Sequence, residues 1–133
     1  MLGWNRVYQD YFLAGDLYYQ VLTRTDSTGT VAVMSASRAD ETLTIPDFVE
    51  CDGITYEVTE IKDLRTSTVK NVVIGSHLTA ITDYAFVSCD NLAEISVSPD
   101  NVNYSSKDGV LFNKQQTVLV KYPKTKKGNF YEI

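Results

Sequence analysis

A recurring apolar pattern constrains the fold of this chain more than any other feature of its sequence. Segments 69–81 and 92–104 share the spacing apolar-x-x-apolar-x-apolar. The matched pairs, all at the same offset, are Val69 with Leu92, Val72 with Ile95, and Ile74 with Val97. A period in the twenties is typical of a solenoid, in which each coil is too small to bury its own apolar face and needs its neighbour. The sequence therefore predicts stacked coils, each with one short strand whose apolar residues point inward.

Less regular copies of this pattern lie upstream. The earlier copy of the strand contains Leu43 and Ile45, which match Val72 and Ile74 at a longer offset. A second apolar element also recurs, and its two copies are slightly closer in sequence than segments 69–81 and 92–104 are. Its matched pairs are Val58 with Leu78 and Ile61 with Ile81. The coil that begins at the earlier copy of this element is three residues shorter, since it lacks the Ala-Phe step found at 85–86.

The stretch 84–97 combines an aromatic turn with one of the repeating strands. Its start, 84–91, is expected to form a short helical turn on the other side of the coil. Ala85 is small enough for this turn to lie close to the core, and Phe86 is expected to fill the space between coils. Cys89 occupies a position where a small buried apolar group fits.

Cys89 could instead be a catalytic nucleophile. A nucleophilic cysteine needs a base and a lowered pKa, and the chain has one histidine, His77, in a turn after the preceding strand. We favour a structural role for Cys89 and a surface position for His77. The second cysteine, Cys51, could pair with Cys89 in an oxidising compartment, or both could stay free. No spacing typical of a metal or cofactor site is present, so we expect neither.

Composition favours one β-rich domain. The 133 residues include 44% apolar side chains, nine tyrosines and five phenylalanines, and aromatic residues favour strands. The net charge of −5 argues against nucleic acid as a partner, and we interpret the lysine cluster at 121–129 as a solvated loop. The apolar runs are far too short to cross a bilayer, so we expect no membrane insertion. Residues 1–15 lack the pattern of a signal peptide.

Two β-hairpins are predicted outside the repeating strands. Residues 17–35 contain two strand-like runs around a turn that ends at Gly29, and residues 109–122 contain two such runs around 113–116. The first hairpin is expected to cover the open end of the solenoid, which would otherwise expose a sheet edge.

We treat the whole chain, 1–133, as one domain. Residues 1–42 form an N-terminal capping segment with its hairpin, and residues 43–133 form irregular repeat coils that include the second hairpin. Segment 1–14 contains aromatic side chains at helical spacing, which we interpret as a face docked on the core. These are Trp4, Tyr8 and Tyr11 or Phe12.

The segment 78–123 carries a set of residues at fixed spacings that is specific to one family. They are Ile81, Ala85-Phe86, Cys89, Leu92, Ile95, Val97, Asn101, Tyr104, Asp108-Gly109-Val110-Leu111-Phe112 and Tyr122-Pro123. With them, the chain resembles the BspA-like leucine-rich repeats. Upstream residues resemble the region that often precedes such repeats, so the resemblance covers about 15–133.

The resemblance implies a β-rich leucine-rich-repeat solenoid, with a short parallel sheet on one face and short helical turns. It also implies a bacterial setting at the cell surface or in secreted form, and a non-catalytic role in protein binding or adhesion. The chain departs from the family in having one full Ala-Phe coil and in stopping at 129–133, where the family usually continues. These departures indicate either the first part of a longer solenoid or a very short one.

The candidate protein-binding face is the outward row of the predicted strands. It consists of Thr44, Asn71, Val73, Gly75, Glu94, Ser96 and Ser98. These side chains are small and mostly polar, without the Trp, Tyr or Arg anchors of binding hot spots. We therefore expect weak binding to a host or bacterial surface protein, reinforced by several copies.

Two other functions are compatible with the sequence. The chain could be a structural cap or spacer of a longer solenoid, in which case self-association through an open end would be possible. It could also be an enzyme or hold a small ligand, but no catalytic or phosphate-binding motif supports that alternative.

Overall fold

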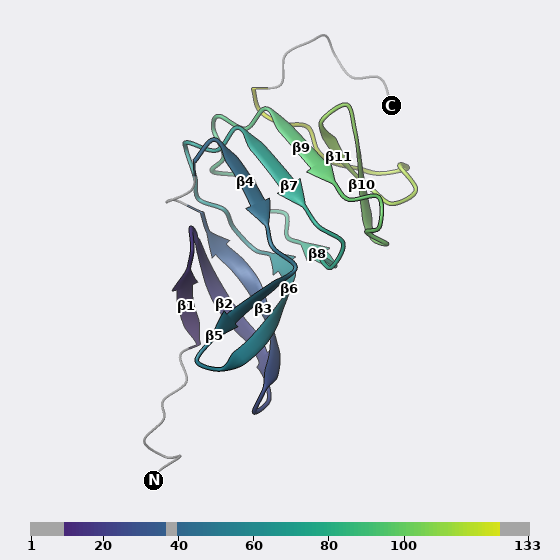
Figure 1. Ribbon diagram of the computed structural model, residues 1–133. Coiled ribbons are helices and arrows are strands. Elements are labelled where there is room, and N and C mark those ends of the chain that lie inside the picture. The colour runs from purple at the N-terminus through teal and green to yellow at the C-terminus, as the bar shows by residue number, and fades with distance from the viewer. Residues whose placement is uncertain (1–9, 37–39, 126–133) are drawn as a thin grey trace.

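The computed structural model describes residues 10–36 and 40–125 of the protein, and these residues form twelve β-strands in three sheets (Figure 1). The described residues include no α-helix, and so none that could span a membrane. The β-rich class is confirmed. The short helical turns that we expected are absent from the described ranges.

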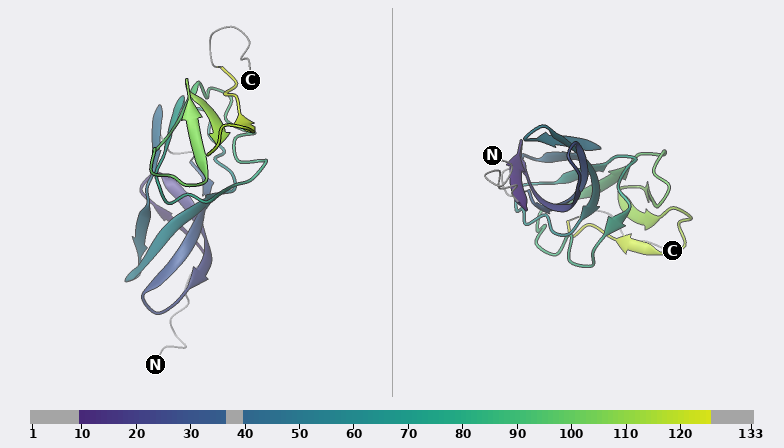
Figure 2. Two further views of the ribbon diagram at one scale, coloured as in Figure 1. Left: turned by 90° about the vertical axis from the view of Figure 1, so that its right-hand side faces the viewer. Right: turned by 90° about the horizontal axis from the view of Figure 1, so that it is seen from below.

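The first sheet has six strands, in the order β1-β2-β3-β6-β5 with β8 paired to β6. Their bounds are β1 Tyr11–Ala14, β2 Leu17–Arg24, β3 Thr28–Ser35, β5 Phe48–Cys51, β6 Ile54–Ile61 and β8 Ala80–Ile81. β3 and β8 run parallel to β6, and the other pairs are antiparallel. The sheet curls so that β1 approaches β5 (Figure 2). Phe12, Tyr19 and Tyr56 are buried in its core, and the Tyr19 and Tyr56 ring centroids lie 5.4 and 5.3 Å from that of Phe12.

Tight turns connect the antiparallel strands of this sheet. Gly15 begins the β1–β2 turn at φ +61°, and Gly53 ends the β5–β6 turn at φ +82°. Glycine adopts such angles at little cost, which makes it the usual residue of two-residue hairpin loops. The hairpin predicted at 17–35 is confirmed as β2 and β3.

The helical spacing that we predicted for the first residues is wrong for Tyr11 and Phe12, because both lie in strand β1. Phe12 is buried while its neighbours Tyr11 and Leu13 are exposed, which is the alternation of a strand. Pairing with β2 supplies hydrogen bonds that an isolated turn of helix would lack. Trp4 and Tyr8 lie outside the described residues.

Gly29 lies in β3, although we had assigned it to the turn. It pairs with Tyr56 of β6, and a β-carbon at this position would lie closer than 3.0 Å to the Tyr56 ring and to the backbone oxygen of Thr23. The close approach of the buried ring therefore requires glycine here.

The second sheet is the repeating unit predicted from the sequence. It consists of β4 Thr42–Ile45, β7 Asn71–Ile74 and β9 Glu94–Val97, which are all parallel and lie side by side (Figure 1). The inward rows are Leu43-Val72-Ile95 and Ile45-Ile74-Val97. The matched apolar positions are thus in register, as the recurring pattern predicted.

A second parallel ladder, formed by β3, β6 and β8, lies on another side of the core. Val33 of β3 pairs with Ile61 of β6, and Ile61 pairs with Ile81 of β8. The predicted match between Ile61 and Ile81 is therefore confirmed. The N-terminal hairpin adds β3 to this ladder as its first strand.

The segment 84–91, predicted as a helical turn, is a run of separate tight turns. Backbone hydrogen bonds span three residues, from Ala85 N to Thr82 O and from Cys89 N to Phe86 O. The carbonyl of Ala85 accepts a hydrogen bond from Leu64 N of the preceding coil, so it is not used to extend a helix. Ala85, Phe86 and Cys89 are all buried, as predicted.

The third sheet is antiparallel and consists of β10 Tyr104–Lys107, β11 Val110–Asn113 and β12 Leu119–Lys121. The hairpin predicted at 109–122 is confirmed as β11 and β12, with an irregular register between Leu111 and Phe112. Strand β10 was not assigned from the sequence. Its turn to β11 has positive φ angles at Asp108 and Gly109.

This third sheet covers the outer edge of β9. Ile95 N donates to Gly109 O and Val97 N donates to Ser106 Oγ, both at 2.9 Å. Because the chain itself occupies these donors, self-association through an open end finds no support at this edge.

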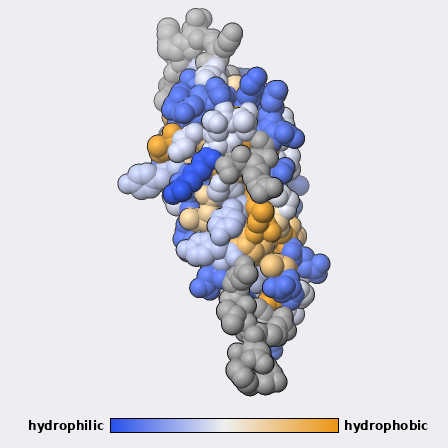
Figure 3. Space-filling model, turned by 90° about the vertical axis from the view of Figure 1, so that its left-hand side faces the viewer, coloured by the Kyte–Doolittle hydropathy of each residue, from blue (hydrophilic) through white to orange (hydrophobic). Residues whose placement is uncertain are grey.

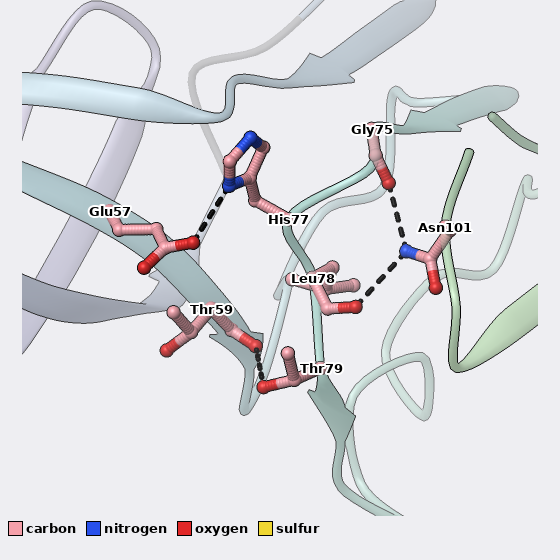
Figure 4. A network of polar contacts seen from close by, with 7 residues as sticks. All are labelled: Glu57, Thr59, Gly75, His77, Leu78, Thr79 and Asn101. Atoms are coloured by element: carbon pink, nitrogen blue, oxygen red, sulfur yellow. Dashed lines mark hydrogen bonds and ion pairs between the residues drawn. The ribbon is translucent and has the colours of Figure 1, made fainter.

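Asn101 is fully buried and joins the segment after β9 to the segment between β7 and β8 (Figure 4). Its Nδ2 donates to Gly75 O at 2.9 Å and to Leu78 O at 3.0 Å. Its Oδ1 accepts from Asn103 N and Tyr104 N, both at 2.8 Å. The side chain of Asn101 therefore forms hydrogen bonds with four backbone groups, two carbonyls and two amides.

We expect Asn101→Ala to lower the free energy of unfolding by about 3 kcal/mol or more, because it leaves several buried backbone groups without partners. Urea unfolding followed by circular dichroism would measure this. Asn103→Ala, at an exposed position in the same turn, is the control and should change stability by less than about 0.5 kcal/mol. Equal effects of the two substitutions would contradict this role of Asn101.

We expect Gly29→Ala to destabilise the first sheet by about 2 kcal/mol or more, because the added methyl group collides with backbone and with a buried ring. Thr28→Ala, at the exposed neighbouring position, is the matched control. Thermal unfolding of both variants measures the difference, and a Gly29→Ala protein as stable as wild type would show that the Tyr56 ring is free to move away.

Candidate functional site

The predicted face is present as two rows of side chains across β4, β7 and β9. The rows are Thr42-Asn71-Glu94 and Thr44-Val73-Ser96. These residues alternate with buried ones along each strand, so they point away from the core. Gly75 and Ser98 follow directly after β7 and β9. The structure thus brings the candidate residues to one surface.

The two ends of this face are partly covered. The carboxylate of Asp47 lies where a β-carbon of Gly75 would be, and the side chain of Glu94 lies against Gly109 of the β10–β11 turn. The open part is centred on Val73, which is 36% exposed. Sequence reasoning could not find this covering, because Asp47 and Gly109 come from other segments.

The face combines polar groups with a small apolar centre. Its residues supply hydroxyl groups, one amide and one carboxylate around the methyl groups of Val73. No cluster of three or more His, Cys, Asp or Glu side chains that could hold a metal ion occurs within residues 10–36 and 40–125. The polar groups of the face can donate and accept hydrogen bonds around a small apolar centre.

Cys89 has the chemistry of a core residue. Its side chain is buried, and burial raises the pKa of its thiol to about 11, although a hydrogen bond from the Thr66 backbone acts in the opposite direction. A nucleophilic cysteine requires the reverse shift. Cys51 is half-buried, its thiol pKa is also raised by burial, and both cysteines are free.

His77 forms an ion pair that the sequence did not reveal. Its Nδ1 lies 2.7 Å from Oε2 of Glu57 on β6, and both side chains are more than one third exposed (Figure 4). The hydrogen bond to Glu57 raises the pKa of His77, and the charge of Asp47 acts in the same direction. The surface position expected for His77 is correct, but its partner comes from a separate strand of the first sheet.

A cleft of about 340 Å³ adjoins this pair. Glu57 and Phe48 line it, and the Phe48 ring lies 4.9 Å from that of His77. The rest of the lining comes from the β2–β3 hairpin and from Thr55. The signal in the sequence that could have indicated it is the alternation of threonines in 23–30, which places several hydroxyls on one side of a hairpin.

Exposed aromatic side chains also gather on β1 and β2. The rings of Tyr11 and Tyr18 stack with centroids 6.1 Å apart and planes 6° apart, and Leu13 beside them is 48% exposed. Figure 3 shows an apolar patch on the side of the molecule that carries β1. This patch lies on a different sheet from the strand face, and it shares strand β2 with the cleft.

Comparison with known proteins gives matches in structure alone. A scan against protein-family models yields no match, and no curated protein matches the sequence. A leucine-rich repeat protein from Bacteroides capillosus superimposes with a TM-score of 0.55 at 19% sequence identity, over 71% of this chain and 70% of that one.

A leucine rich cell surface protein from Faecalibacterium prausnitzii superimposes with a TM-score of 0.54 at 22% identity. The match covers 72% of this chain and 25% of that protein, so the chain corresponds to about a quarter of its length. The chain therefore has the fold of the bacterial leucine-rich repeat proteins, in agreement with its resemblance to the BspA-like repeats.

Proposed function

We propose that the chain is a non-catalytic protein-interaction module that binds its partner with the outward face of β4, β7 and β9. The observation that carries this proposal is the register of the three parallel strands, which aligns their outward side chains into rows. Such rows suit an extended partner segment, because each successive strand repeats the same spacing of about 4.8 Å. We further propose that the strands belong to successive coils of a short solenoid.

The composition of the face supports weak, multivalent binding. Its exposed centre is Val73, and the surrounding side chains are hydroxyl-bearing or small. Tight interfaces usually contain buried aromatic or arginine anchors, and the face has none. Several linked copies can compensate, because the second contact then forms at a high effective concentration.

The proposed location is the cell surface or the extracellular space of a bacterium, with adhesion as the biological role. The similar protein from Faecalibacterium prausnitzii is described as a cell surface protein. Adhesion at a surface would present many copies of the module at once, which is the condition that weak binding requires.

A structural cap or spacer is the second candidate. It is favoured by β3, which extends the ladder of β6 and β8 with a strand of the N-terminal hairpin in place of another coil. In this alternative, residues 1–42 would serve as the cap and 43–133 as the coils, and the outward face would be only a solvated surface.

The double substitution Val73→Arg with Ser96→Arg should abolish binding through the face, since it places two bulky charges at its centre. The protein, displayed as a tetramer, would be titrated on intact bacterial and animal cells, before and after the cells are treated with protease. We expect wild-type binding to be lost after protease treatment and to fall at least about tenfold with the double variant.

Val102→Arg is the matched control, because Val102 is 74% exposed and lies outside the face. It should bind as wild type. If the double variant also binds as wild type, or if no cell type binds the tetramer, the cap or spacer role would be favoured over a binding module.

We expect Cys89 to resist thiol reagents in the folded protein at pH 8, where its thiol stays protonated and buried. Reaction with a chromogenic disulfide should modify Cys51 first and Cys89 only on unfolding. Rapid modification of Cys89 in the native protein would reopen the catalytic alternative, and Cys51→Ala supplies the protein in which its rate is measured alone.

A further inference from the structure

The threonine-lined cleft is built on the outer surface of four neighbouring strands of the first sheet. The cross-strand partners in this region are Thr23 of β2 with Thr30 of β3, Thr30 with Glu57 of β6, and Glu57 with Phe48 of β5. Paired residues of neighbouring strands point to the same side. A single row across the sheet therefore carries hydroxyls, then a carboxylate, then an aromatic ring.

A second row widens the hydroxyl-bearing end of the cleft. Thr28 of β3 pairs with Thr55 of β6, and Thr25 lies beside Thr28 with 2.9 Å between their Oγ1 atoms. Together with the first row, this gives five threonines along the lining. The cleft volume of about 340 Å³ lies within the range of about 300–1,000 Å³ usual for small-molecule sites.

The polar groups of the cleft keep hydrogen-bonding capacity. The hydroxyls of Thr23 and Thr30 lie 2.8 Å apart, and since each hydroxyl has one donor and two acceptor positions, the pair leaves one donor unused. The Thr55 hydroxyl has no hydrogen bond within the part of the chain that the structure describes. His77 engages Oε2 of Glu57, which leaves Oε1 as an acceptor.

Phe48 supplies the apolar side of the site. It is 52% exposed, although phenylalanine is usually buried in folded proteins. Its ring leans on His77, whose position is fixed by the hydrogen bond to Glu57. The aromatic ring and the carboxylate are therefore held next to each other, at one end of a row of hydroxyls.

We propose that this cleft binds a neutral sugar, with the apolar face of one pyranose ring against Phe48 and its hydroxyls bonded to Glu57 and the threonines. A pyranose carries C–H groups on its faces and hydroxyls around its rim, which matches an aromatic ring beside a row of polar groups. This site is separate from the strand face proposed above and does not depend on it.

The lining disfavours charged ligands. No lysine or arginine is among the described residues that line the cleft, and Glu57 would repel an anion. A quaternary ammonium would be attracted by Phe48 and Glu57, but such ligands are usually held by several aromatic rings. Here one aromatic ring faces five hydroxyls, and an ammonium without N–H groups cannot bond to them.

The test is a titration of the ¹⁵N-labelled protein, followed by amide chemical shifts. The probes are the methyl glycosides of glucose, galactose, mannose and N-acetylglucosamine, each up to about 50 mM, with choline as the cationic comparison. We expect at least one sugar to bind with a millimolar dissociation constant and to shift the amides of β3, β5 and β6 around Thr30, Phe48 and Glu57. Choline should cause no such shifts.

Two substitutions in the cleft make the test specific. Phe48→Ala should weaken sugar binding about tenfold and Thr30→Val about fivefold, since they remove the stacking surface and one hydroxyl while keeping the strands intact. The matched controls are Tyr84→Ala, an exposed aromatic residue elsewhere, and Thr117→Val, at an exposed position between β11 and β12, and both should bind sugar as wild type does.

Three outcomes would overturn the proposal. They are the absence of shifts in the cleft with all four sugars, wild-type sugar affinity of both cleft variants, and cleft shifts with choline but with no sugar. The amide spectra of the variants also report whether each is folded, so a loss of binding through unfolding is recognised directly.

Discussion

The inward packing of three short parallel strands is the constraint on which the rest of the structure depends. β4, β7 and β9 have four residues each, and strands of this length are not stable alone. Each places two apolar side chains inward, in register with those of its neighbour, and each buried side chain contributes about 1.5–3 kcal/mol. Because side chains alternate along a strand, the same register fixes the outward rows. The candidate binding face is thus a direct consequence of how the core packs.

Polar side chains also link neighbouring segments of the chain. Thr79 Oγ1 donates to Thr59 O at 3.1 Å (Figure 4), and Thr82 Oγ1 donates to Lys62 O at 2.8 Å, so both bonds link the segment around β8 to the segment around β6. Asn101 performs the same task in the core, where water is excluded and unpaired backbone groups are costly. Apolar burial stabilises the strands, and these hydrogen bonds restrict their relative positions.

The sequence predicted those parts of the fold that follow from local spacing. The pairs Val72 with Ile95 and Ile61 with Ile81, and both hairpins, could be read from apolar periods and turn residues. The helical turn at 84–91 could not be excluded, because the carbonyl of Ala85 is bound by Leu64, a partner in the preceding coil. Local patterns contain no information on such a partner.

The strand face and the cleft differ in how far local sequence patterns could predict them. The strand face could be listed residue by residue, since it is the alternate side of a periodic pattern, although the covering of Gly75 by Asp47 could not. The threonines of 23–30 could indicate hydroxyls on one side of a hairpin, but the cleft itself could not be predicted from them. The cleft also requires the parallel pairing of β3 with β6 and the approach of His77 to Phe48, and these two long-range contacts have no signature in the surrounding residues.

The most direct measurement of the central claim is the set of nuclear Overhauser effects between backbone protons of the second sheet. The parallel register of β4, β7 and β9 predicts contacts that pair Thr44 with Val73 and Val73 with Ser96, at the spacing of adjacent parallel strands. It also predicts slow hydrogen exchange for the amides of Ile95 and Val97, which the third sheet covers. Contacts displaced by one residue would contradict it, because such a shift would turn the outward rows into the core.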